Sequence, residues 1–122
     1  MAELLTYETI KKDLAIHVGA MVPWRFTWKA GGFRVPFNGN EKLIFTWGKT
    51  GSLTLSAGSG ITYETVDGLV NARLVARLTN AQTRLLPKGL LTSYEMQTGV
   101  AEQERALFMG RVLVEGGANP DA

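Results

Sequence analysis

The feature that most constrains the fold of this chain is a two-residue alternation of apolar and polar side chains. Its clearest example is the segment VPWRFTWKA at residues 22–30, where large rings alternate with polar groups: Trp24, Phe26 and Trp28 on one side, and Arg25, Thr27 and Lys29 on the other. Successive side chains of an extended chain point to opposite faces, so this spacing predicts a strand that buries one of its faces.

The same alternation recurs along the chain in short segments that glycine-containing turns separate. These segments are 14–18, 41–47, 52–57, 61–65, 69–78, 90–98 and 104–116, and the chain contains 14 glycines. Val66-Asp67-Gly68 has the composition of a hairpin turn. We therefore expect an all-β fold of about eight or nine short strands, arranged as an immunoglobulin-like antiparallel β-sandwich.

Residues 104–116 differ from the other segments because both faces are substantially apolar. One face carries Ala106, Phe108, Val112 and Val114, and the other carries Leu107, Met109, Arg111 and Leu113. Such a strand is either central and covered on both sides, or it presents its outer face to another subunit. We take the second set as candidate protein-interface residues.

Two arginines lie on the polar face of segment 69–78. Arg73 and Arg77 flank Val75, on the side opposite Leu74 and Ala76. This pattern is typical of a solvated face or of a charged protein interface, so both arginines join the candidate interface residues. The net charge of the chain is only +2, and these cations are not interleaved with aromatic residues, so we expect no nucleic-acid partner.

The N-terminal residues 1–13, MAELLTYETIKKD, predict either an extended arm or an edge strand. Leu4, Leu5 and Tyr7 are candidate interface residues, because an arm of this kind can extend onto a neighbouring subunit and add a strand to its sheet. We expect one β-sandwich domain over residues 14–116, followed by a mobile polar tail at 117–122.

The segment TNAQTRLLPKG at residues 79–89 interrupts the strand pattern. A short helical turn near 80–86 is predicted, with Thr79 or Asn80 as its N-terminal cap. Leu85 and Leu86 are then expected to plug the open end of the sandwich. The Pro-Lys-Gly sequence that follows stops the turn and redirects the chain into the next strand.

Composition excludes several kinds of chemistry. The chain has no cysteine and a single histidine, His17, so disulfides and thiolate metal sites are absent and a zinc ligand set is not available. No apolar run approaches the roughly 18 residues that a membrane-spanning helix needs. We expect no metal, no cofactor and no membrane partner.

No residue set predicts catalysis. Gly48-Lys49-Thr50 resembles the end of a phosphate-binding loop, but Leu43 stands where that loop needs its first glycine, and the residues that follow read as a strand instead of a helix. A plain hairpin turn is the better interpretation. No serine has the strand-turn-helix setting of an exposed nucleophile, and we predict that the protein is not an enzyme.

The aromatic residues allow two interpretations. Trp24, Phe26, Trp28, Phe45 and Trp47 are either the core of the sandwich or a platform on which sugar rings stack. The core interpretation is favoured, because the rings alternate with polar residues and large rings dominate protein cores. Exposed rings would instead indicate a carbohydrate-binding module.

From residue 13 to residue 117 the pattern resembles a family of tailed-phage virion proteins, the N-terminal domain of the phage upper baseplate protein and its small relatives. The matching features in the second half run in order along the chain: Leu78-Thr79, then Thr83, Leu86 and Gly89, then Tyr94, and then a strand from Leu107 to Val114 that contains Gly110. Upstream, DLAIHVGAMVPWRFTWKAGG resembles the opening of the family, a strand, a glycine and an aromatic-rich strand.

The resemblance implies an immunoglobulin-like sandwich with a structural role in a virion that assembles in the host bacterial cytoplasm. The expected function is that of a small adaptor docking on tail, baseplate or fibre proteins, as a homo-oligomer or symmetric ring. Larger relatives carry further C-terminal modules, whereas this chain ends at Ala122. A capsid-decorating or head fibre-anchoring role is therefore an alternative, and carbohydrate binding a weaker one.

Overall fold

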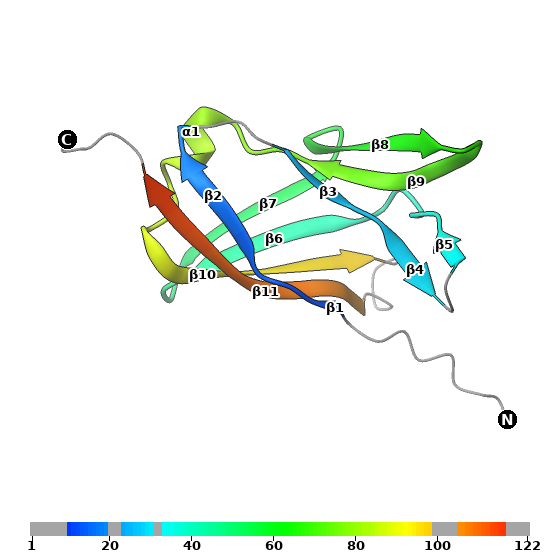
Figure 1. The fold of residues 1–122 in the computed structure, drawn as a ribbon. Helices are drawn as coiled ribbons and strands as arrows, with labels where there is room; N and C mark the ends of the chain where they lie inside the picture. Colours follow the sequence, from blue (N-terminus) through cyan, green and yellow to red (C-terminus); the bar gives the residue numbers. More distant parts are fainter. Residues whose placement is uncertain (1–9, 20–22, 31–32, 99–104, 117–122) are drawn as a thin grey trace, which may run out of the picture.

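The fold consists of short strands and a single helical turn in the part of the chain that the structure describes (Figure 1). This structure is a computed structural model, and it describes residues 10–19, 23–30, 33–98 and 105–116. The elements are β1 (Ile10–Lys11), β2 (Leu14–Val18), β3 (Trp24–Phe26), β4 (Trp28–Ala30), β5 (Phe33–Val35), β6 (Lys42–Trp47), β7 (Gly51–Ala57), β8 (Gly60–Val66), β9 (Leu69–Ala76), α1 (Asn80–Thr83), β10 (Gly89–Thr98) and β11 (Arg105–Gly116). The all-β expectation is confirmed.

Nine strands form one curled sheet, in the order β1-β11-β10-β6-β7-β8-β9-β3, with β2 also paired to β11. Strands β4 and β5 form a separate hairpin. The sheet is mixed, because β1 and β2 run parallel to β11 and β7 runs parallel to β8. The immunoglobulin-like arrangement of two antiparallel sheets is therefore not confirmed.

The sheet curls because β7 and β8 are joined only at one corner. Their pairing is limited to Ser56↔Gly60 and Ala57↔Ile61, where the end of β7 meets the start of β8. This corner separates two walls, which face each other across the core (Figure 1). We call them the β10–β11 wall (β1, β2, β11, β10, β6 and β7) and the β8–β9 wall (β8, β9 and β3).

The core is the space between these walls, and the alternation in the sequence decides which residues fill it. Leu43 and Phe45 of β6 and Tyr94 and Met96 of β10 are buried, as the period of two predicts. Rings from opposite walls meet there: Phe26 and Phe108 have centroids 5.0 Å apart, and those of Trp24 and Phe45 are 5.7 Å apart. Aromatic pairs at such separations contribute about 0.5–1.5 kcal/mol beyond their buried area.

The helical turn α1 closes one end of the molecule. Thr79 caps it, since its hydroxyl accepts from Gln82 N at 3.1 Å while the Gln82 side chain accepts from Thr79 N at 2.8 Å. The buried Thr83 hydroxyl accepts from Gly19 N at 3.1 Å, which fastens the turn to the end of β2. The predicted cap is confirmed, and the helix is shorter than expected, ending at Thr83 instead of residue 86.

Only one of the two leucines expected to plug this end does so. Leu86 is buried, with 5% of its surface exposed, whereas Leu85 is 59% exposed. Consecutive residues of a turn point about 100° apart, so only one of two neighbours can face the core. Gly89 then takes a positive φ of 90° as the chain enters β10, as the predicted redirection requires.

The N-terminal strand crosses closely over β11 at Gly110. Between β1 and β2, a Cβ atom on Gly110 would lie 2.3 Å from the Lys12 carbonyl oxygen, so only glycine fits there. The Tyr94 hydroxyl donates to that same oxygen. Burial, with the Asp13 charge as a second cause, raises the pKa of Tyr94 to about 12, and the phenol therefore remains a donor at neutral pH.

A buried carboxyl group connects the two walls. Glu41 is 1% exposed and accepts four hydrogen bonds, from Asn38 N at 2.9 Å, Gly39 N at 3.1 Å, the Tyr63 hydroxyl at 2.7 Å and the Thr98 hydroxyl at 3.0 Å. Burial, followed by the hydrogen bond to Glu41, raises the pKa of Tyr63 well above its usual range. A buried polar group satisfied in this way has a structural role.

Replacing Leu86 with Asp will lower the free energy of unfolding by several kcal/mol, because it places an unpaired charge in the closed end of the core. Leu85→Asp is the matched control, since the same change at this exposed neighbour should alter stability by no more than about 0.5 kcal/mol. Urea denaturation of both variants measures the difference. Equal losses would show that Leu86 does not close the core.

Stability will decline in alkaline solution as the buried tyrosines ionise. The pKa of Tyr94 is raised from 10.0 to about 12 by folding, so its contribution is complete below pH 10 and is lost as the pH rises toward 12. In urea titrations across this range, Tyr94→Phe should reduce the decline by up to about 1.4 kcal/mol per pH unit. An unchanged slope in the variant would contradict the assignment.

Candidate protein interface

Large apolar side chains gather on the outer face of the β10–β11 wall. Among the described residues, Leu90 is 50% exposed, Leu91 is 65% exposed and Met109 is 37% exposed, and Leu113 is half-buried beside them. We call Leu90, Leu91, Met109 and Leu113 the apolar face. Leu90, Leu91 and Leu113 lie at the bulge, and Met109 lies beyond Arg111 with Lys11 and Glu95 directly beside it. Exposed apolar residues that lie close together indicate a contact surface.

Strand pairing brings these residues together. Strands β10 and β11 are antiparallel, with Ser93 opposite Arg111 and Glu95 opposite Met109 on the outer side. The register shifts between Gly89 and Thr92, and at such a bulge the regular alternation fails. Both Leu90 and Leu91 are consequently exposed, where a regular strand would turn one of them inward.

Arg111 is fixed at the centre of this face. Its backbone N–H donates to Asp13 Oδ1 at 3.0 Å, and its guanidinium Nη1 donates to the Leu90 carbonyl oxygen at 2.9 Å. The side chain therefore spans from β11 to the bulge of β10 while remaining exposed. Arginine is enriched at protein interfaces, where its flat guanidinium and apolar stem both make contacts.

Polar residues border the apolar face on the side of β6 and β7. Ser93 of β10 is opposite Thr46 of β6, which is opposite Ser52 of β7. All three are exposed. On the other side Ala15 of β2, which is also exposed, lies opposite Leu113. An apolar centre with a polar border is the usual composition of a protein-protein contact.

The structure brings together three of the predicted interface residues and places a fourth in the core. Met109, Arg111 and Leu113 lie on the outer face of β11, as expected. Leu107 is 1% exposed and belongs to the core, so its placement on the outer face was wrong. The reason is a second bulge: Met96 pairs with Phe108 but Gln97 pairs with Ala106, so Leu107 is an extra residue that turns inward beside Phe108.

The remaining predicted interface residues lie elsewhere. Arg73 is on β9, in the opposite wall, and forms an ion pair with Glu64 at 3.0 Å. Arg77 directly follows the last residue of that strand. Leu4, Leu5 and Tyr7 lie outside the described residues. The candidate residues thus fall into two groups on different walls.

Sequence reasoning missed Leu90 and Leu91. The alternation of Thr92, Tyr94 and Met96 places Leu91 on the opposite, outer face of the strand, so the exposure of Leu91 could have been predicted from the spacing. The exposure of Leu90 depends on the bulge, for which the sequence has no signal beyond the neighbouring Gly89.

The phosphate-loop-like sequence and the aromatic residues considered as a sugar platform both have structural roles. Gly48-Lys49-Thr50 forms the turn between β6 and β7. Phe26 and Phe45 belong to the core, and Trp24, Trp28 and Trp47 pack against it. Within the described ranges, no group of three or more His, Asp or Glu residues is arranged to hold a metal. The described residues also include no helix of the length and apolarity needed to span a membrane.

Leu91→Ala will leave the free energy of unfolding within about 0.5 kcal/mol of the wild-type value, because Leu91 lies on the surface. The same change at the core position Leu107 should cost about 2–5 kcal/mol. Thermal and urea denaturation of the two variants measure the contrast. A large loss in Leu91→Ala would mean that this leucine supports the fold and is not free to bind a partner.

Comparison with known proteins adds no assignment to this surface. No protein-family model matches the chain, and no curated protein matches it. The likeness to tailed-phage virion proteins stays a prediction from the sequence pattern.

Proposed function

We propose that this protein is a non-enzymatic structural component of a phage particle, a small adaptor that docks on tail, baseplate or fibre proteins. The observation that carries the proposal is the apolar face of Leu90, Leu91, Met109 and Leu113 around Arg111. The resemblance of residues 13–117 to virion proteins gives the kind of partner.

Docking through this face is energetically favourable for a simple reason. Each large apolar side chain removed from water contributes about 1.5–3 kcal/mol. Two exposed leucines and a methionine can thus supply several kcal/mol against the entropy lost on association. Arg111 is already held by the Leu90 carbonyl oxygen, so less of its side-chain entropy is lost when a partner binds.

A capsid-decorating or head fibre-anchoring protein would use the same face on a different partner. The two roles share the chemistry of the contact and differ in which virion protein lies next to it. Chemical cross-linking of purified particles, with the cross-linked partner identified by mass spectrometry, separates them.

Particle incorporation tests the proposal directly. The gene is deleted from a phage that carries it, and the wild-type protein or a variant is supplied in trans. Purified particles are then analysed by quantitative mass spectrometry. We expect the wild-type protein in the particles and a loss of roughly tenfold or more for Leu91→Lys/Leu113→Lys.

The matched control is Ser52→Lys/Thr54→Lys, which adds the same charges to the polar part of the same wall, where both residues are exposed. It should be incorporated like the wild type. Absence of the wild-type protein from purified particles would refute the structural role. Normal incorporation of Leu91→Lys/Leu113→Lys would show that the apolar face is not the docking surface.

A further inference from the structure

The outer face of the β8–β9 wall contains a shallow hollow. It has a volume of about 250 Å³ and is lined by Gly58, Gly60, Thr62, Val75, Arg77 and Thr79. Thr62 pairs with Val75, and Arg77 N donates to the Gly60 carbonyl oxygen at 2.9 Å. Two of the lining residues are glycines, whose lack of side chains leaves space on one side of the hollow. Val75, which is only 6% exposed, forms its apolar floor.

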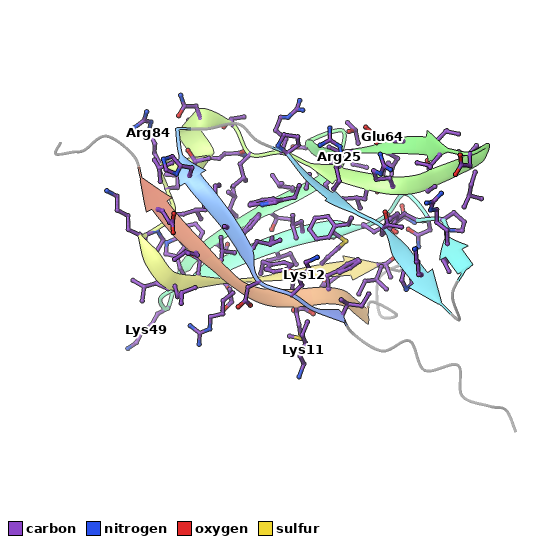
Figure 2. All side chains as sticks on the ribbon, in the orientation of Figure 1. Lys11, Lys12, Arg25, Lys49, Glu64 and Arg84 are labelled. Atoms are coloured by element: carbon purple, nitrogen blue, oxygen red, sulfur yellow. The ribbon has the colours of Figure 1, made fainter. Side chains whose placement is uncertain are left out.

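Two unpaired cations stand beside this floor. Arg25 of β3 lies opposite Val75 and is exposed (Figure 2). Arg77, which directly follows the last residue of β9, is exposed as well. Within the described residues neither guanidinium has a hydrogen bond or an ion pair, in contrast to Arg73, which binds Glu64 at 3.0 Å. Arg25 and Arg77 are thus available to an anion from outside.

The size of the hollow restricts what can fill it. At about 250 Å³ it is smaller than the roughly 300–1,000 Å³ that small-molecule and cofactor sites usually occupy. It suits one or two amino-acid side chains. An apolar floor beside two guanidinium groups matches a carboxylate next to an apolar side chain, since arginine binds carboxylates through paired N–H···O bonds.

The charge distribution along the chain shows where such a carboxylate can come from. The described segments contain all 13 Lys and Arg residues but only six of the 11 acids, which gives them a formal side-chain charge of +7. The other segments contain the remaining five acids and no Lys or Arg, a charge of −5. Residues 1–9 contain Glu3 and Glu8 and no Lys or Arg, so this segment can be attracted to the cations of a second copy.

Among the acidic segments, residues 1–9 are the best suited to reach another molecule. The sequence MAELLTYET places Glu3 and Glu8 on either side of two leucines and a tyrosine, and nine extended residues span up to about 30 Å. The acidic segment 99–104 is instead attached at both ends, between β10 and β11. Residues 1–9 lead into β1, which lies on the other side of the molecule from β8 and β9 (Figure 1).

We propose that the hollow beside Val75 receives residues 1–9 of a second copy of this chain. A glutamate of that segment binds Arg25 and Arg77, and an adjacent leucine covers Val75. This contact goes beyond the proposed function and does not depend on it, because it uses the opposite wall and needs no other protein. Repetition of the contact from copy to copy gives a closed dimer or a ring.

Sedimentation velocity of the full chain over a range of concentrations tests the contact, at low ionic strength and again at about 1 M salt, where exposed charges are screened. We expect concentration-dependent association of the wild type that salt weakens. Arg25→Glu/Arg77→Glu should weaken it roughly tenfold or more, and so should Glu3→Arg/Glu8→Arg. Mixing the two charge-reversed variants should restore association between them.

Lys49→Glu is the control for charge reversal outside the hollow, because Lys49 is exposed on the turn between β6 and β7, far from Arg25 (Figure 2). It should associate like the wild type. A wild type that stays monomeric would overturn the proposal, and this includes the case in which residues 1–9 dock on their own chain. Equal association of Arg25→Glu/Arg77→Glu and Lys49→Glu, or no association in the mixture of reversed variants, would overturn it as well.

Discussion

The carboxyl group of Glu41 is the interaction on which the two-walled architecture depends. It joins Tyr63 of the β8–β9 wall to Thr98 of the β10–β11 wall, and it fixes the loop before β6 through two backbone N–H groups. A buried carboxyl group is tolerated only when its oxygens are hydrogen-bonded. Because β7 and β8 pair over only two residues, the backbone ladder links the walls at one corner, and this side-chain network adds a second link between them.

Two other close contacts hold the curled sheet at its ends. The Thr83 hydroxyl fastens α1 to Gly19, and the Lys12 carbonyl oxygen receives the Tyr94 hydroxyl above Gly110. These contacts all use inward or loop groups. On the described outer faces of the two walls, the side-chain contacts noted above are the Arg73–Glu64 ion pair and the hydrogen bond of Arg111 to Leu90. That division explains how a small domain can leave Leu91 and Arg77 exposed without loss of stability.

The sequence predicted which side of most strand segments is buried, with Leu107 as an exception, but not how the strands pair. Alternation placed Phe45 and Tyr94 inward and Met109 outward, because side-chain direction is a local property of extended chains. The bulges that bury Leu107 and expose Leu90 depend on register with a partner strand, which no local pattern records. For the same reason the parallel pairing of β2 with β11 and the role of Glu41 were not foreseen. The apolar face was therefore predicted in part, and the hollow was not.

The two proposed contacts would respond differently to the surroundings, because they rest on different forces. Binding at the apolar face gains free energy because apolar side chains are removed from water, and salt does not weaken this contribution. The hollow beside Val75 relies on Arg25 and Arg77, whose exposed charges are screened within about 8 Å at physiological ionic strength. Since the core separates the two walls, binding on one does not require rearrangement of the other. A chain that contacts its own copies through charge and a different protein through apolar surface can keep the two associations distinct, as a component of a larger assembly requires.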